Sequence, residues 1–248
     1  MLLAMDIGNS TIKFGVFDGG YLNSKFSIPT IRTYSPEDLR QIIGNKLTGS
    51  IRNAIACSVV PEIDESLRAF CTEHLGVEVV FVNNSFDFGL KINYEPPSSL
   101  GIDRLVAAYA AAQKYGIPCI ICDFGTATTI DAVNHNGEYL GGIIAPGMAT
   151  MAEALHLTTS KLPIVEIAKP KNVIGNSTVL SVQSGIFYGY IGLVEGIISR
   201  IREELDQNTK VFATGGFASL IAKNCKKINA VDENLMLSGL NLIFKSDP

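Results

Sequence analysis

Two short stretches of this chain combine an acidic residue, a glycine and several hydroxyl or amide residues directly after an apolar run. The first reads DIGNST from Asp6, and the second reads DFGTATT from Asp123. Successive backbone N–H groups in a turn form an anion-binding nest, to which hydroxyl side chains add donors. A carboxylate beside such a nest can hold Mg²⁺ through water, because Mg²⁺ gives up its water ligands reluctantly. The two stretches therefore predict two phosphate-binding turns, with a magnesium position near Asp6.

The two turns belong to a longer internal repeat. Residues 6–22 and 123–140 match at one constant offset of nearly half the chain. Each copy predicts a β-hairpin, in which the glycine permits the tight turn and the returning strand alternates apolar and polar residues. A duplicated hairpin followed by helices predicts two similar α/β domains, residues 1–115 and 116–248, that face a central cleft.

Lys13 distinguishes the two copies of the repeat. In the first hairpin Ile12 and Phe14 share the apolar face, so Lys13 points with Thr11 to the other face. The constant offset aligns Lys13 with Ile130 in the second copy. One half of the chain thus supplies a cation for phosphate oxygens and the other does not. Each turn taken singly also fits an Asx-type turn that satisfies only its own backbone.

A second candidate site is the stretch GIDR, residues 101–104, at the start of a predicted helix. Asp103 in a first helical turn is favoured by the helix dipole, which is a purely structural interpretation. Arg104 opposes that dipole, and its planar donors suit a carboxylate or a phosphate. The pair therefore predicts a site that binds an anionic substrate and orients its hydroxyl group.

The elements that must position these residues follow an α/β pattern. N-cap residues, prolines in first turns and closing glycines mark the helices, and short apolar runs mark the strands. The predicted helices span 35–47, 61–74, 99–115 (with Ser98 or Ser99 as N-cap), 147–157, 177–205, 217–224 and 234–244. Besides the hairpins, the predicted strands span 54–60, 77–82, 138–144 and 210–213.

Composition excludes several classes of protein. The 248 residues are 47% apolar, carry a formal net charge of −4 and contain no basic block, so neither a nucleic acid nor a membrane is an expected partner. The longest apolar stretches are too short to span a bilayer, and the first residues lack a signal-peptide pattern. Five irregularly spaced cysteines predict a cytoplasmic protein, and Cys119 and Cys122 are interpreted as buried strand residues. Three scattered histidines predict no transition-metal site.

The common nucleotide-enzyme and hydrolase signatures are absent from the sequence. It contains no GxxxxGK[ST], no GxG and no GxSxG, and no histidine precedes Arg-Asp. P-loop, Rossmann, hydrolase-elbow and protein-kinase sites are therefore excluded.

Five motifs taken together, in order and spacing, resemble the type III pantothenate kinases. They are residues 6–11, 101–104, 123–129, 141–147 (GGIIAPG) and 175–178 (GNST). The resemblance implies two ribonuclease-H-like domains of the actin-like ATPase type, in a cytoplasmic homodimer. It also implies that ATP phosphorylates pantothenate, the first step of coenzyme A synthesis.

The resemblance also implies roles for individual residues. The catalytic base would be Asp103, and Asp123 would bind the activating monovalent cation, potassium or ammonium. ATP would contact Asp6, Ile7, Gly8, Asn9, Ser10, Thr11, Ile12, Lys13 and Thr126. Pantothenate would contact Tyr94, Gly101, Ile102, Asp103, Arg104 and Thr178, with Thr178 completing the pocket across the dimer. Ser10 stands where threonine is commoner, and GNST varies the usual GKNT.

Two other functions remain open at the level of sequence. Another small-molecule kinase of the same superfamily would keep the Asp6 and Asp123 turns but accept a sugar or a short acid. A non-catalytic ATP-binding regulator is expected to lack Asp103, Arg104 or Lys13. All three residues are present.

Overall fold

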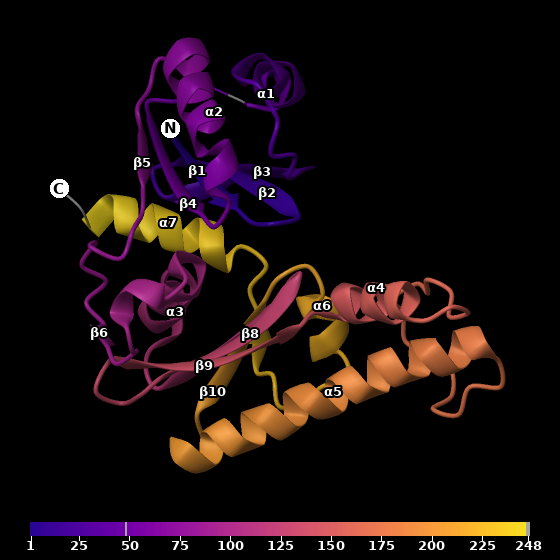
Figure 1. Cartoon of the computed structure of the whole chain (residues 1–248). Coiled ribbons are helices and arrows are strands. Elements are labelled where there is room, and N and C mark those ends of the chain that lie inside the picture. The colour runs from indigo at the N-terminus through magenta and orange to yellow at the C-terminus, as the bar shows by residue number, and fades with distance from the viewer. Residues whose placement is uncertain (48, 247–248) are drawn as a thin grey trace. The chain divides into compact units, whose positions relative to one another are not determined.

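The computed structural model describes residues 1–47 and 49–246, which form two compact α/β units (Figure 1). Unit 1 consists of Met1–Lys114 together with the C-terminal segment from Asn234, and unit 2 is Tyr115–Glu233. The C-terminal helix is thus grouped with unit 1, whereas the predicted domain 116–248 includes it in the second half. The physical reason is its packing against strands at the start of the chain.

Unit 1 is built on a mixed sheet in the order β3-β2-β1-β4-β5. The first three strands form an antiparallel meander, and β4 and β5 continue the sheet in parallel. The strands are β1 (Leu2–Ile7), β2 (Thr11–Asp18), β3 (Tyr21–Pro29), β4 (Asn53–Ser58) and β5 (Val79–Phe81), and the short β6 (Lys91–Ile92) follows. The helices are α1 (Pro36–Ile43), α2 (Pro61–Phe70), α3 (Ile102–Tyr115) and α7 (Leu235–Ser246).

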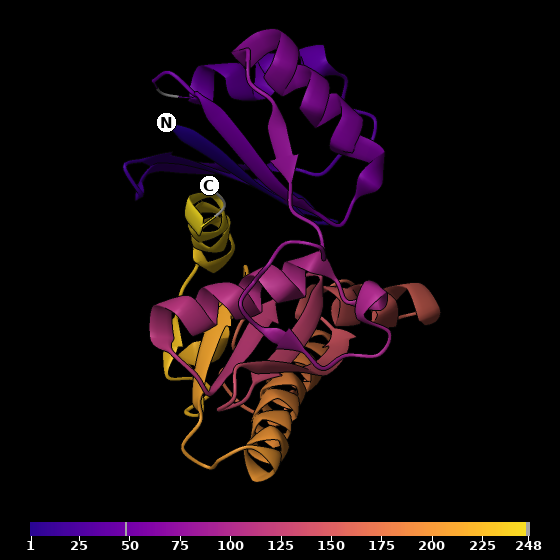
Figure 2. The same cartoon turned by 90° about the vertical axis from the view of Figure 1, so that its left-hand side faces the viewer.

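Helices cover both faces of the unit 1 sheet. Alternate residues of β1, including Leu3 and Met5, join Leu39 of α1 and Leu67 of α2 in one buried core. On the other face α7 packs against β1, β2 and β4, so the sheet lies between two helical layers (Figure 2). Gly239 of α7 in turn lies against α3.

Unit 2 repeats this arrangement, with strands side by side in the order β11-β10-β7-β8-β9. These strands are β7 (Cys119–Phe124), β8 (Ala127–Val133), β9 (Glu138–Pro146), β10 (Lys210–Thr214) and β11 (Ala230–Val231). The helices are α4 (Met148–Thr158), α5 (Thr178–Glu204) and α6 (Ala218–Ala222), and their apolar residues share one core with β7, β8 and β10. The matching strand orders make the internal duplication visible.

The turns of the two hairpins differ in length by one residue. In the first hairpin Ile7 pairs with Ile12, and in the second Phe124 pairs with Thr128. Asp6 therefore faces Lys13, whereas Asp123 faces Thr129. The alignment of Lys13 with Ile130 is thus wrong, because a constant offset ignores the shorter turn.

Local sequence signals fix some element boundaries and miss others. The Ser35 hydroxyl accepts the Asp38 N–H in a capping box that starts α1. The helix predicted from Ser98 or Ser99 instead begins at Ile102, because Pro97–Ser99 form a separate 3-10 turn. All five cysteines are buried and free, as interpreted for Cys119 and Cys122. None of the described helices is long and apolar enough to cross a membrane.

Candidate functional site

The first Asp-x-Gly turn connects β1 to β2 at the C-terminal end of β1. The Gly8 N–H donates to the Thr11 carbonyl at 3.1 Å and closes the turn. Thr30 holds the turn from outside, since its hydroxyl donates to the Gly8 carbonyl at 2.6 Å and its N–H to the Ser10 carbonyl at 3.0 Å. The carbonyls thus face Thr30, and the side chains of Asn9 and Ser10 remain exposed at the tip.

Asp6 and Lys13 form an ion pair across the β1–β2 hairpin. The Lys13 Nζ donates to the Asp6 Oδ2 at 3.2 Å, as their facing positions in the ladder permit. The Asp6 side chain is 12% exposed and that of Lys13 is 34% exposed, so the pair lies at the edge of the protein interior. The hairpin therefore presents a carboxylate and an ammonium together beside the exposed turn.

Asp103 lies in the same neighbourhood as Asp6. The negative charges of both carboxylates raise the pKa of the buried Cys57 thiol. Cys57 faces Asp6 in the parallel β1–β4 ladder. Burial, followed by the charges of Asp6, Asp103 and Asp64, raises the pKa of the Cys57 thiol well above its ordinary value. Cys57 therefore stays protonated at neutral pH, and the charges of all three carboxylates reach it.

Ser58 and Asp64 support this region and were missed by the sequence analysis. The Ser58 hydroxyl donates to the Asp64 Oδ1 at 2.5 Å and accepts the Val60 N–H at 3.2 Å. The adjacent Val59 N–H donates to the Ile7 carbonyl at 3.1 Å, next to the Asp6 turn. Burial raises the pKa of the Asp64 carboxyl, and the Ser58 hydrogen bond opposes that shift. The available signal was a serine at a strand end followed by an acidic first helical turn.

The GIDR stretch places Asp103 and Arg104 in the first turn of α3. The Arg104 N–H donates to the Asp103 Oδ1 at 2.8 Å. A Cβ at Gly101 would lie only 2.6 Å from that same oxygen, so a glycine there leaves room for the Asp103 carboxylate.

Arg104 is buried, and its side chain contacts Tyr94. The Arg104 Nη1 donates to the Tyr94 hydroxyl at 3.4 Å, and its guanidinium carbon lies 5.5 Å from the centre of the Tyr94 ring. This cation–π arrangement holds the guanidinium in one orientation. A fixed, buried guanidinium beside a carboxylate is suited to an anionic group that carries a hydroxyl.

The second Asp-x-Gly turn, in unit 2, has nearly the same internal bonding as the first. The Gly125 N–H donates to the Ala127 carbonyl at 3.1 Å, and Thr126 at the tip is exposed. The Thr126 carbonyl accepts two hydrogen bonds. One comes from the N–H of Gly147, the N-cap of α4, at 3.0 Å, and the other from the hydroxyl of Thr150 in α4, at 2.6 Å.

Two glycines crowd against the second turn. A Cβ at Gly147 would overlap the Gly125 carbonyl, and one at Gly215, after β10, would overlap the Asp123 carboxylate. Gly147 closes the GGIIAPG motif, which thereby contributes to this turn. Gly215 also has a φ of 94°, where other residues are strained.

Thr178 occupies a different part of unit 2. It is exposed at the first residue of α5, directly after the N-cap Ser177, whose hydroxyl accepts the Leu180 N–H at 3.3 Å. Residues with exposed apolar side chains surround this end of α5 in the sequence, namely Val173, Ile174, Val179 and Leu180.

The donor sets around the two turns suit weakly held cations. Among the described residues no group of three or more histidine, cysteine or acidic side chains is arranged to hold a metal ion. Each turn instead offers one carboxylate, Asp6 or Asp123, beside backbone groups. That set fits Mg²⁺ held mainly by water and phosphate oxygens, or a monovalent cation held by one carboxylate and carbonyls.

Comparison with known proteins shows the family of this chain. The model of the type III pantothenate kinase family matches residues 2–200. A type III pantothenate kinase of Koribacter versatilis is 42% identical, over 99% of this chain and 95% of the relative. One of Brevibacillus brevis is 40% identical, over 99% and 98%. The chain belongs to the type III pantothenate kinase family.

Solved structures similar to this pantothenate kinase show its fold. A putative Baf family transcriptional activator from Campylobacter jejuni has a TM-score of 0.64 at 22% identity, covering 99% of this chain and 98% of that one. A putative 2-dehydro-3-deoxygalactonokinase from Sinorhizobium meliloti has a TM-score of 0.62 at 12% identity, covering 100% and 97%. The predicted α/β class, here built on two mixed sheets, is confirmed.

Replacing Ser58 with alanine is expected to destabilise this pantothenate kinase by about 1–3 kcal/mol at neutral pH, because Asp64 loses its donor. The Ser58 hydrogen bond lowers the Asp64 pKa against the larger effect of burial, so this bond favours the ionised carboxylate. The loss should therefore shrink as the pH falls toward the ordinary value of 3.8. Thermal unfolding at neutral and acidic pH measures the loss of stability in Ser58→Ala. Ser50→Ala, at an exposed serine, is the matched control. An equal loss at both pH values would contradict the role of Asp64.

Proposed function

We propose that this chain performs the reaction of its family, the ATP-dependent phosphorylation of pantothenate, with the Asp6 turn on the phosphates and Asp103 on the substrate alcohol. The observation that best supports this proposal is that the charges of Asp6 and Asp103 both raise the pKa of one buried thiol, that of Cys57. A nucleotide-binding turn and a candidate base thus belong to one neighbourhood, as phosphoryl transfer requires.

On the nucleotide side, the exposed tip of the Asp6 turn supplies hydroxyl and amide donors, and Lys13 supplies positive charge. The Lys13 Nζ, now 3.2 Å from Asp6, lies within reach of phosphate oxygens beside the turn. Thr126 at the tip of the second turn is proposed as a further ATP contact, which its exposure permits. Positioning and charge neutralisation are the main tasks of a protein in this reaction.

On the acceptor side, Asp103 accepts the proton of the primary alcohol of pantothenate as the phosphoryl group transfers. Arg104 and Tyr94 bind the polar and anionic groups of the substrate, and their mutual contact fixes the guanidinium. Gly101 and Ile102 complete this stretch, in which the glycine leaves space for the Asp103 carboxylate.

Asp6 is proposed to hold Mg²⁺ through water, and Asp123 to bind the activating monovalent cation. When bound, these cations neutralise charge on the phosphates. The single carboxylate in each turn, with Asp123 against Gly215, supports loosely held ions rather than permanent ones.

The Asp103→Asn variant is expected to lower kcat by about 10²–10⁴-fold, because an amide cannot accept the alcohol proton. ATP binding should be unchanged. Coupled detection of ADP gives the rate, and calorimetric titration of a non-hydrolysable ATP analogue gives the affinity. Glu73→Gln, at an exposed acid, is the matched control. Turnover close to that of the control would remove Asp103 from the chemistry.

Replacing potassium with sodium at constant ionic strength should lower the rate of ADP release with pantothenate. The reason is that Asp123 and nearby backbone groups would fit the larger cation. Asp123→Asn should reduce the difference between the two salts. The same assay with sugars and short acids in place of pantothenate tests the acceptor. Equal rates in both salts would contradict the cation site, and preference for a sugar would contradict the acceptor.

A homodimer is proposed along α5, with Thr178 completing the pantothenate pocket of the partner. Gly185, Gly189 and Gly192 recur on one exposed face of α5, and a Cβ at any of them would meet no atom within 4 Å. Glycines allow another helix to approach closely. Exposed apolar side chains near Thr178, with Ile174 87% exposed, gather at and just before the N-terminal end of the same helix.

The Gly189→Leu variant is expected to turn the dimer into a monomer, because the added side chain occupies the space of the neighbouring helix. Within one chain the site is open, so folding should be retained. Light scattering after size-exclusion chromatography measures the mass, and circular dichroism the fold. Gly44→Leu adds the same side chain in unit 1 as a control. A Gly189→Leu dimer would contradict this interface.

The cytoplasm is the proposed location. Five buried free cysteines support it, since their thiols persist in a reducing compartment.

A further inference from the structure

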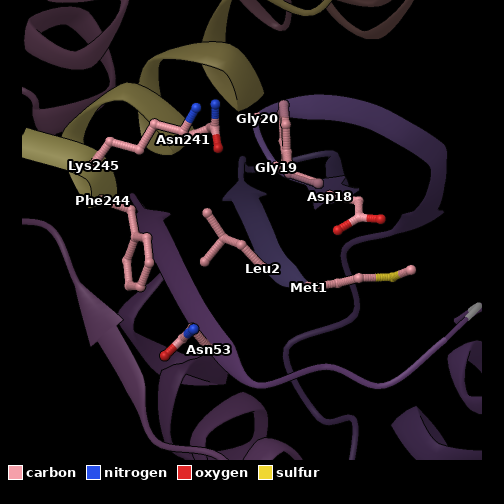
Figure 3. Close-up of a pocket in the computed structure, with 10 residues that line it drawn as sticks. Met1, Leu2, Asp18, Gly19, Gly20, Asn53, Asn241, Phe244 and Lys245 are labelled. Carbon is pink, nitrogen blue, oxygen red and sulfur yellow. The ribbon is translucent and has the colours of Figure 1, made fainter.

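A cavity of about 320 Å³ lies in unit 1 at the start of β1, away from the residues assigned to catalysis. It is bordered by the N-terminal end of β1, the β2–β3 turn and the last turns of α7 (Figure 3). Leu2 lines the cavity, and Asp6 is four residues further along the same strand, or roughly 13 Å at the usual rise. The cavity is therefore separate from the phosphate-binding turn.

Asn241 is the unusual residue of this cavity. It lies on the otherwise apolar buried face of α7, and the residue is only 7% exposed. It forms no hydrogen bond with any other residue that the structure describes, and it points into the cavity (Figure 3). The carboxamide is open to the cavity, so a bound molecule can both donate a hydrogen bond to it and accept one from it.

Two opposite charges stand on the walls of the cavity. Lys245 of α7 lies over Gly20, where the lack of a Cβ leaves space for its ammonium group. Asp18, at the end of β2, contributes a carboxylate. Within the described part of the chain neither charge is paired with another side chain. A simple anion would face Asp18 and a simple cation would face Lys245, so a zwitterion complements both.

Besides Asn53 and the glycines of the β2–β3 turn, the rest of the lining is mainly apolar. Leu2, Phe17 and Phe244 form a surface suited to an aliphatic side chain. A volume of 320 Å³ is near the lower limit of ordinary ligand sites. Both observations favour a molecule of the size of one amino acid.

We propose that this cavity is a second ligand site, which binds a free α-amino acid with an apolar side chain. The ligand carboxylate binds Lys245, its ammonium group binds Asp18, and Asn241 bonds to one of these two groups. The side chain lies on Leu2 and Phe244. Because α7 packs against α3 at Gly239, and α3 carries Asp103, ligand binding stabilises the helix that backs the candidate base.

The test is calorimetric titration of the full chain with L-leucine, isocaproate and isoamylamine. Isocaproate lacks the ammonium group of leucine, and isoamylamine lacks its carboxylate. Leucine is expected to bind saturably, and each analogue about tenfold more weakly, because it leaves one wall charge without a partner. Absence of saturable leucine binding would overturn the proposal, as would isocaproate binding as tightly as leucine.

Variants locate the binding at this cavity. Lys245→Met and Asp18→Asn should each weaken leucine about tenfold, and Asn241→Leu should also weaken it. Lys223→Met, at an exposed lysine of unit 2, is the matched control and should bind normally. Thermal unfolding and ADP release without leucine should be unchanged in Lys245→Met. Equal losses in Lys245→Met and Lys223→Met would overturn the assignment to this cavity.

Discussion

The ion pair between Asp6 and Lys13 depends on a backbone register, and the proposed chemistry of unit 1 depends on that pair. The two residues face each other only because four residues separate Ile7 from Ile12 in the turn. One residue fewer, as in the second hairpin, places Thr129 rather than a lysine opposite the aspartate. The first turn therefore has a lysine opposite its aspartate, and the second turn has none.

The duplication explains how two turns of similar geometry come to have different neighbours. Both turns follow the central strand of a sheet with the same strand order. Thr30, directly after β3, donates hydrogen bonds to two carbonyls of the first turn. In the second turn the donors are Gly147, the N-cap of α4, and Thr150 within α4. Each fixing contact uses carbonyl groups, which leaves the donors at the tips accessible. The scaffold is therefore shared, and the polar side chains added around it differ.

Local signals in the sequence predicted the hairpins, the capping box of α1 and the long helix α5, because each depends on neighbouring residues. They failed where distant contacts decide the outcome. The start of α3 was placed too early because nothing local separates the Pro97–Ser99 turn from the helix. Tyr94 and Arg104 were predicted to share a site and do touch. Ser58 and Asp64 were missed, because their partnership arises only when β4 and α2 are positioned by the sheet.

The return of α7 to unit 1 makes that unit discontinuous along the chain. Its first 114 residues emerge early from the ribosome, but the face of the sheet formed by β1, β2 and β4 lacks its covering helix until the last residues are made. Unit 2 is continuous and can complete its own core first. The earliest part of the protein to be synthesised is thus the last to be finished, and its exposed apolar surface must be kept from aggregating until then.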